Sequence, residues 1–203
     1  ALNTDRQHME QLVDAMDETA FRSTLQELTQ QSQKFLEATA LASDEAYQSM
    51  LEQSLRVFTR RVGELLEAER ASLFLVDRER QQLVLRVAQD MPEGEYVRIP
   101  LASGIAGAAA MSGKVVRVDD AYADPRFNQA VDAETGFRTR SMLCLPLQDR
   151  SGAVFAVTQL LNRRDGRPFD EQDTHRYAEF ASSLSVLLES LVKLGGPAAL
   201  RLP

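Results

Sequence analysis

The sequence predicts an α+β protein with a central, mainly antiparallel six-stranded sheet flanked by helices, preceded by a long N-terminal helical extension. Near both ends of the chain, apolar residues recur every three or four positions, a period typical of helices. Between about 71 and 161 they alternate or form short runs, which is typical of strands. Strands grouped between helices favour an antiparallel α+β sheet.

The first element is a predicted helix over residues 2–42, a stretch without glycine or proline that is rich in Gln, Glu, Leu and Ala. A helix of roughly 40 residues extends about 60 Å, at 1.5 Å per residue. A small domain cannot bury that length alone, so we expect the helix to meet a partner, most simply a second copy of the chain. The heptad is imperfect, because Ser32 and Thr39 fall on its seam.

The remaining elements follow in order. Ser43 begins a second helix that ends near Glu69, and Ser103 with Gly104 opens a short helix, 105–111, which Gly113 ends. The last helix begins at Phe169, Asp170 and Glu171 and stops at Gly195-Gly196-Pro197. We therefore divide the chain into an N-terminal signalling and dimerisation helix, a globular domain and a C-terminal tail or linker: 1–42, 43–193 and 194–203. The predicted strands are 71–76, 83–88, 96–100, 115–118, 141–147 and 153–161.

Composition excludes several classes of function. A net charge of −7 and a pI near 5.0 argue against nucleic acid or an anionic membrane as partner. No apolar run reaches the roughly 18 to 20 residues that span a bilayer, and nothing resembles a signal peptide. The single cysteine, Cys144, lies in an apolar run, so we expect it to pack in a core in the reducing cytoplasm. His8 and His175 form no metal-like cluster, and we predict no metal site.

The stretch from Gly104 to Asn162 has the parts of a small-ligand pocket. Gly104 and Gly107 let backbone approach closely, and the free amides that open the 105–111 helix form an anion site. Residues 119–139 form a long segment without a strand pattern that carries three aromatic rings. Such a segment is usually functional or disordered, and its aromatic residues favour a function.

These residues resemble the GAF domains, small-molecule-binding modules of signalling proteins, and are most similar to the regulatory GAF domains of cyclic-nucleotide phosphodiesterases and cyanobacterial adenylyl cyclases. The resemblance runs in order through about 45–190. The residues that carry it are Ala71 to Asp77, Arg98-Ile99-Pro100, Gly104-Ile105-Ala106-Gly107, Asp119 to Asn128, Gly136-Phe137-Arg138-Thr139-Arg140 and Asn162.

The resemblance includes a signature that nucleotide-binding members of this subgroup share: Asn-Lys, a spacer, Phe, three residues, then Asp-Glu. Here it is Asn162-Arg163, Phe169 and Asp173-Thr174. Arginine keeps a cation able to pair with Asp173, although its geometry differs from that of lysine. The final Glu is lost. The family uses this signature to brace the fold rather than to touch ligand.

The resemblance also implies a set of ligand contacts. It assigns Ser72, Ala88 and Gln89 to the base and Ile105 and Ala106 to the phosphate. The rest of the nucleotide would meet Asn128, Asp132, Thr135, Thr139 and Gln159. Asp132 and Thr139 could instead cap their loop.

The base end departs from the family pattern. Relatives that bind cyclic GMP often stack the base on an aromatic ring where this chain has Ala88, and the missing ring could remove about 1–3 kcal/mol. They often carry a carboxylate where it has Gln89 or Gln159. A glutamine amide donates and accepts, so it could read an adenine edge, and we favour cyclic AMP over cyclic GMP.

Three functions are compatible with these features. The first is a sensory module in which a cyclic nucleotide, cyclic AMP or cyclic GMP, closes the 119–139 loop and the change passes through dimeric helices to an output domain absent from this chain. The second is a degenerate domain that acts as a ligand-free dimerisation scaffold. An enzyme is the third, but GAF-fold methionine sulfoxide reductases need more than one cysteine, and bilin photoreceptors of this fold need a cysteine outside the Cys144 strand. We therefore expect no enzyme.

Overall fold

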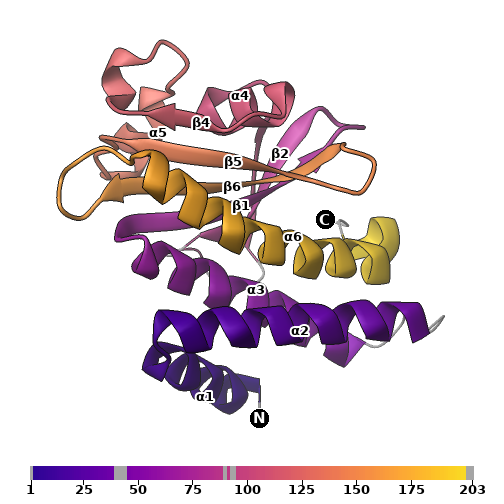
Figure 1. Ribbon diagram of the computed structural model, residues 1–203. Helices are drawn as coiled ribbons and strands as arrows, with labels where there is room; N and C mark the ends of the chain where they lie inside the picture. Colours follow the sequence, from indigo (N-terminus) through magenta and orange to yellow (C-terminus); the bar gives the residue numbers. More distant parts are fainter. Residues whose placement is uncertain (1, 39–44, 89–90, 92–94, 200–203) are drawn as a thin grey trace.

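The computed structural model describes residues 2–38, 45–88, 91 and 95–199. It stacks four layers: α4 with its neighbouring loops, the sheet, the helices α3 and α6, and the helices α1 and α2 (Figure 1). The helices are α1 (Leu2–Ala15), α2 (Glu18–Ala38), α3 (Glu45–Leu65), α4 (Gly104–Ser112), α5 (Gln129–Thr135) and α6 (Glu171–Ala199), with a single 3-10 turn at Ala121–Ala123. Within these described residues no helix is both long and apolar enough to cross a membrane.

The sheet has the strand order β3-β2-β1-β6-β5-β4, and every neighbouring pair is antiparallel. Its strands are β1 (Ala68–Asp77), β2 (Gln82–Ala88), β3 (Val97–Pro100), β4 (Val116–Val118), β5 (Met142–Gln148) and β6 (Val154–Arg163). The predicted α+β class and the six-stranded antiparallel sheet are confirmed. The first and last long strands, β1 and β6, form the central pair.

Each face of the central strands packs into its own hydrophobic core. Leu73 and Leu75 of β1 belong to the larger core, which also takes in residues of α2, α3 and α6. Phe74 points to the opposite face and joins a smaller core with Ile105 and Ala109 of α4. Because side chains alternate along a strand, one strand serves both cores. We call these two sides the helix face and the α4 face.

The single helix predicted over residues 2–42 is wrong, because the chain turns at Met16 and Asp17 between α1 and α2. Asp17 caps the second helix: its Oδ1 accepts a hydrogen bond from the backbone N–H of Ala20 at 2.8 Å. The backbone C=O of Met16, freed by the break, accepts from Arg61 of α3 at 2.7 Å. Asp17 followed by the acidic Glu18 is a helix-start signal that the sequence contained.

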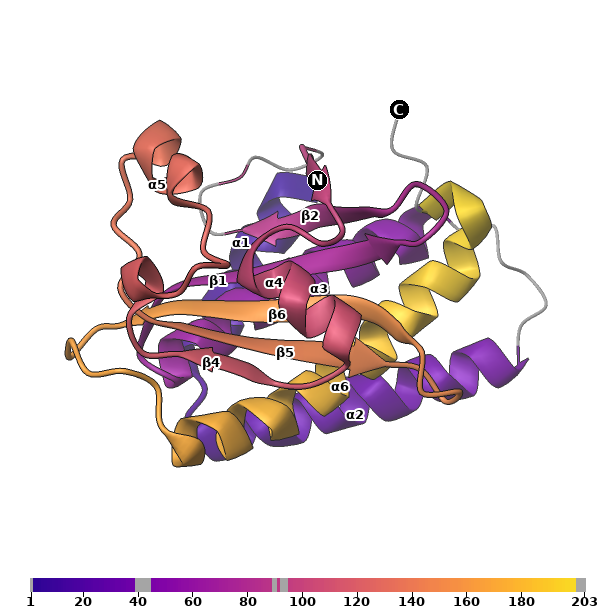
Figure 2. The same cartoon turned by 90° about the horizontal axis from the view of Figure 1, so that it is seen from above.

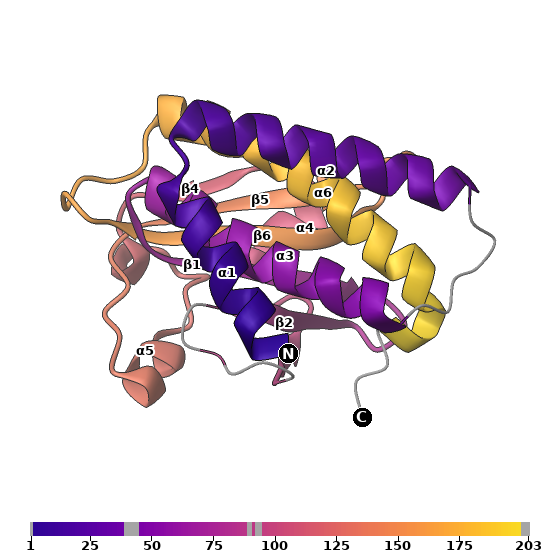
Figure 3. The ribbon, with the colours of Figure 1, turned by 90° about the horizontal axis from the view of Figure 1, so that it is seen from below.

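The two N-terminal helices pack on their own chain, so the premise that a single domain cannot bury this segment is also wrong. Phe21 is fully buried between the rings of Phe58 and Phe180, at centroid distances of 5.6 and 5.9 Å. Arg22 pairs with Glu179 of α6, and Arg176 of α6 pairs with Glu18. Seen from below, α1 and α2 lie over α3 and α6 (Figure 3). The break allows this, since a straight helix could not follow both.

Two helix ends differ from the predicted ones by several residues. The second helix ends at Leu65 rather than near Glu69, because Glu67 takes a positive φ of 55° and β1 begins at Ala68. The last helix runs through Gly195-Gly196-Pro197 to Ala199. Glycine weakens a helix by only about 1 kcal/mol, and a proline close to its end removes a single hydrogen bond.

The docked N-terminal helices should contribute to the stability of the domain. We expect Phe21→Ala to lower the free energy of unfolding by about 3–5 kcal/mol, the usual cost of emptying a buried aromatic site. Leu12→Ala in α1 is the control, because Leu12 is 51% exposed. Urea unfolding followed by circular dichroism measures both. A Phe21→Ala variant as stable as Leu12→Ala would show that α2 is not docked in solution.

Candidate functional site

A row of residues crosses the α4 face of the sheet at the level of the predicted ligand contacts. Cys144 of β5 lies opposite Gln159 of β6, which lies opposite Ser72 of β1, which lies opposite Ala88 of β2. Opposite residues in antiparallel strands point to the same face, so the structure brings together three of the predicted contacts, Ser72, Ala88 and Gln159.

The polar members of this row bond to one another. The Gln159 amide donates from Nε2 to Ser72 Oγ at 3.4 Å, and its Oε1 accepts from Cys144 Sγ at 3.4 Å. All three side chains are buried. Burial raises the pKa of the Cys144 thiol well above its ordinary value, so the thiol stays protonated and does not serve as a nucleophile.

The start of α4 supplies the predicted phosphate contacts, Ile105 and Ala106, whose side chains are buried in the smaller core. Ser103 precedes the helix without capping it by its side chain. The opening amides therefore have no side-chain acceptor there. Gly107 is required, because a Cβ at this position would meet Leu101 O at 2.6 Å. Gly104 takes a φ of 67°, which favours glycine.

The segment 119–139 contains more structure than its sequence predicted. Besides the 3-10 turn it holds α5, which stands away from the sheet at one end of the molecule (Figure 2). Within α5 Asp132 alone is buried. Its carboxylate accepts from Thr139 N at 2.6 Å, Thr139 Oγ1 at 2.7 Å and Tyr122 OH at 3.1 Å. The predicted contacts Asp132 and Thr139 thus bond to each other within the segment.

Two other predicted contacts are exposed residues at the two ends of α5, where Asn128 is the N-cap and Thr135 the last helical residue. Asn128 Oδ1 accepts from Ala130 N at 3.1 Å at its start, and Thr135 Oγ1 donates to Val131 O at 2.8 Å at its end. An open hollow of about 600 Å³ lies beside α5 and is lined by Tyr122, Gln129, Ala130, Asp132, Ala133, Gly136, Phe137 and Arg138. In this structure neither Asn128 nor Thr135 lines it.

The base end is defined in part. Ala88 ends β2, and Gln89 lies outside the described residues. The backbone N–H of Met91 donates to Ala88 O at 3.3 Å, and Met91 O accepts from Arg56 of α3 at 2.9 Å. These two hydrogen bonds link the end of the row to α3 on the other face of the sheet.

Asn162, near the end of β6, bonds to residues around the end of the 119–139 segment. The spacing of residues in the sequence did not reveal these hydrogen bonds. Its side-chain oxygen accepts from Arg140 N at 2.6 Å and Ser141 N at 3.2 Å. Its amide donates to Arg138 O and to Glu69 Oε2 of β1, each at 2.8 Å. Asn162 is fully buried at a φ of 52°, a conformation that asparagine tolerates better than most residues.

The other signature residues form a buried ion pair next to Asn162. Arg163 Nη1 donates to Asp173 Oδ1 at 2.5 Å, while its other nitrogens contact Glu67 and Asp165. The hydrogen bond to Asp173 raises the pKa of the Arg163 guanidinium and outweighs its burial. Phe169 is buried in the larger core. The cluster fixes the start of α6 against the end of β6. Among the described residues, no group of three or more possible metal ligands occurs.

The sheet order, the α4 face and the Asn162 cluster can now be compared with known proteins. The family model for the GAF domain matches residues 50–188. The chain belongs to the GAF domain family.

This GAF domain is similar to parts of two curated proteins. It is 37% identical over 134 residues to the dual 3',5'-cyclic-AMP and -GMP phosphodiesterase 11 of Drosophila melanogaster, covering 59% of this chain and 9% of that protein. It is 39% identical over 129 residues to the probable 3',5'-cyclic phosphodiesterase pde-5 of Caenorhabditis elegans, covering 58% and 17%. The chain therefore spans less than a fifth of either relative.

Solved structures support the fold. The GAF domain from a phosphoenolpyruvate-protein phosphotransferase of Coxiella burnetii superposes with a TM-score of 0.63 and 19% identity, covering 87% of this chain and 98% of that one. At this identity the likeness concerns the fold alone.

The Asn162 cluster should be a major source of stability. We expect Asn162→Ala to lower the free energy of unfolding by about 3 kcal/mol, because it leaves buried backbone groups without partners. Asn162→Gly is the matched variant, since glycine keeps the positive φ but not the amide. If the hydrogen bonds matter most, both variants lose similar stability in urea unfolding. If Asn162→Gly is as stable as the wild type, backbone conformation is the main role.

The same cluster should make stability depend on pH. Burial would raise the pKa of Glu69, but hydrogen bonds from Arg140 and Asn162 outweigh it and lower that pKa. The folded state thus gains stability above the unfolded-state pKa and loses it as pH falls through the folded pKa. Relative to Glu69→Gln, the wild-type advantage in unfolding free energy should shrink between about pH 5 and pH 3. Glu134→Gln controls for net charge; an equal pH trend in both variants would contradict the assignment.

Proposed function

We propose that this GAF domain is a sensory module that binds a 3',5'-cyclic nucleotide on the α4 face of its sheet, with cyclic AMP preferred over cyclic GMP. The observation that carries the proposal is the buried Ser72–Gln159 pair on the face covered by α4, the helix whose first amides Ser103 leaves uncapped. Similarity to two cyclic-nucleotide phosphodiesterases supports the class of ligand.

The phosphate of the ligand would bind at the amides of Ile105 and Ala106. Backbone N–H groups at a helix start, together with the helix dipole, favour an anion. The chain carries a net charge of −7, so a local dipole of this kind is needed to hold a cyclic phosphate. Gly107 supports the site by letting the first turn of α4 lie against Leu101 and Ala102.

The base would be read by Gln159 and Ser72. The amide oxygen of Gln159 already accepts from Cys144, so its remaining amide hydrogen and the Ser72 hydroxyl are the groups left for a ligand. Both groups can donate. On the Watson–Crick edge of the base, N1 of adenine accepts a hydrogen bond, whereas N1–H of guanine would meet another donor. This difference supports cyclic AMP, and Ala88 with Gln89 completes the proposed base end.

The contacts from Asn128, Asp132, Thr135 and Thr139 require the 119–139 segment to move. In the structure these four side chains bond within their own segment. Exposed α5 is tied down through Asp132, so a ligand that offered new partners could draw α5 toward the sheet. The ligand shifts this equilibrium only by the difference between its affinities for the open and closed positions.

The proposal extends to partners. The domain would form a homodimer in the cytoplasm through its N- and C-terminal helices. These helices would pass the conformational change caused by the ligand to an output domain of the same full-length protein. Since α1 and α2 cover α3 and α6, a second copy would meet their outer surfaces, where Leu12 is 51% exposed. Analytical ultracentrifugation that finds only monomer at high concentration would reject the dimer.

A ligand-free scaffold is the second candidate. The mutual bonding of Ser72, Gln159 and Cys144, and of Asp132, Thr139 and Tyr122, favours it, because these groups are satisfied without a ligand. Ala88 also lacks the ring that could stack on a base.

Calorimetric titration distinguishes the two candidates. We expect cyclic AMP to bind more tightly than cyclic GMP, and linear 5'-AMP to serve as the control for the cyclic phosphate. Gln159→Leu should weaken cyclic AMP binding about tenfold, because a lost hydrogen bond costs about 1–1.5 kcal/mol. Gln148→Leu, at the exposed end of β5, is the matched control. No heat and no thermal shift with either cyclic nucleotide at millimolar concentration would reject the sensory module and leave the ligand-free scaffold as the remaining candidate.

A further inference from the structure

We propose that Tyr177 and Thr158, which lie on the helix face of the sheet, are positioning residues for the Ser72 and Gln159 donors on the α4 face. The inference rests on the proposed function, because Ser72 and Gln159 are its base-reading groups. It adds two residues that no part of the sequence pattern singled out and connects the site to α6.

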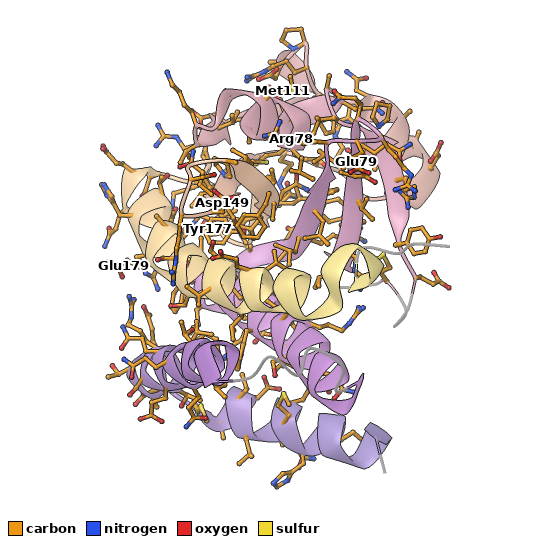
Figure 4. All side chains as sticks on the ribbon, turned by 90° about the vertical axis from the view of Figure 1, so that its right-hand side faces the viewer. Arg78, Glu79, Met111, Asp149, Tyr177 and Glu179 are labelled. Atoms are coloured by element: carbon orange, nitrogen blue, oxygen red, sulfur yellow. The ribbon has the colours of Figure 1, made fainter. Side chains whose placement is uncertain are left out.

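Thr158 and Tyr177 form a polar contact inside an otherwise apolar layer. Thr158 precedes Gln159 in β6, so its side chain points to the opposite face, where it is fully buried. There its hydroxyl bonds to the hydroxyl of Tyr177 from α6, which is also buried. Figure 4 shows Tyr177 between α6 and the sheet, while Glu179 of the same helix lies at the outer side. A hydroxyl pair costs desolvation that two apolar side chains would avoid.

The direction of the hydrogen bonds follows from counting protons. Thr158 Oγ1 also donates to the backbone carbonyl of Ser72 at 3.4 Å. A hydroxyl has one proton, so Thr158 must accept from Tyr177 in order to donate to Ser72. Burial raises the pKa of Tyr177, which keeps its proton available for donation. The hydrogen bonds are therefore donated from Tyr177 to Thr158 and from Thr158 to Ser72.

Thr158 supports β1 close to an irregularity in that strand. Ser72 is paired with Ala88 of β2, but the register between β1 and β2 shifts two residues further on, between Leu73 and Phe74. Thr158 fixes the Ser72 carbonyl from the other side. It also immediately precedes Gln159, so one buried hydroxyl constrains both base-reading residues. A shift of Tyr177 with α6 would move both donors.

The coupling between the position of α6 and the binding of ligand is reciprocal. If the position of α6 changes the affinity for ligand, ligand changes the stability of that α6 position by the same factor. Helix α6 also carries Phe180 and Arg176, which contact α2. The Tyr177 hydroxyl thus lies between the base end of the proposed site and the helices proposed to carry the signal.

The test compares ligand binding in variants that remove one hydroxyl. We expect Tyr177→Phe and Thr158→Val each to weaken cyclic AMP binding about five- to tenfold, within the usual range of coupling between sites. Thr158→Ser keeps the hydroxyl and should bind within about twofold of the wild type. Thr174→Val is the control, because Thr174 is on the same helix but bonds to Asp170 at its exposed start.

Measurements in the Ser72→Ala variant distinguish a positioning role of Tyr177 from general destabilisation. When Ser72 is already changed to Ala, Tyr177→Phe should cause a smaller further loss of affinity, because only the part that acts through Gln159 remains. The proposal is overturned if Tyr177→Phe binds like the wild type, or if its loss is as large in the Ser72→Ala background as alone.

Side-chain NMR tests the positioning without ligand. In the free protein, Tyr177→Phe should shift the Gln159 side-chain amide resonances, whereas Thr174→Val should not. If the wild type binds neither cyclic nucleotide, the proposed function fails, and this measurement alone decides the positioning role. Unchanged Gln159 resonances in Tyr177→Phe would then reject it.

Discussion

The rest of the structure depends on the burial of both faces of the central antiparallel pair, β1 and β6. A strand covered on both sides must find apolar partners in two directions, and here α3 and α6 supply one set while α4 supplies the other. Any polar side chain on this pair loses water and must bond to another protein group. Ser72, Thr158 and Gln159 do so with Cys144 and Tyr177, which is why these five residues form one connected set.

The N-terminal helices cover the layer of helices that packs on the helix face of the sheet. A domain of this order could leave the outer side of α3 and α6 to a partner, but here α1 and α2 cover it with buried Val13, Phe21 and Leu25. The ion pairs around this contact are partly exposed and contribute little by themselves. Apolar burial is therefore the main source of its stability, and any movement of α6 must also be accommodated by α2.

The Asn162 cluster and the Asp132 cluster hold the 119–139 segment in different ways. Asn162 bonds to backbone groups of Arg138, Arg140 and Ser141 and so fixes where β5 begins. Asp132 bonds to Tyr122 and Thr139, within the segment itself. The base of the segment is anchored to the sheet, whereas α5 is tied mainly to its own loop. The movement proposed for α5 would therefore leave the strands that carry Ser72 and Gln159 in place.

The sequence by itself determined the strands, their antiparallel grouping and the short helix, because alternation and glycine positions are local properties. Gly113, for example, ends α4 at a φ of 64°, as its position predicted. It also determined that Arg163 could pair with Asp173. Only the tertiary structure decided where the N-terminal helices lie and that Thr158 meets Tyr177. Those outcomes depend on which faces come together across 19 or more residues, and neither spacing nor periodicity encodes that meeting. A hydroxyl in a strand looks the same in sequence whether it faces water, ligand or another buried hydroxyl.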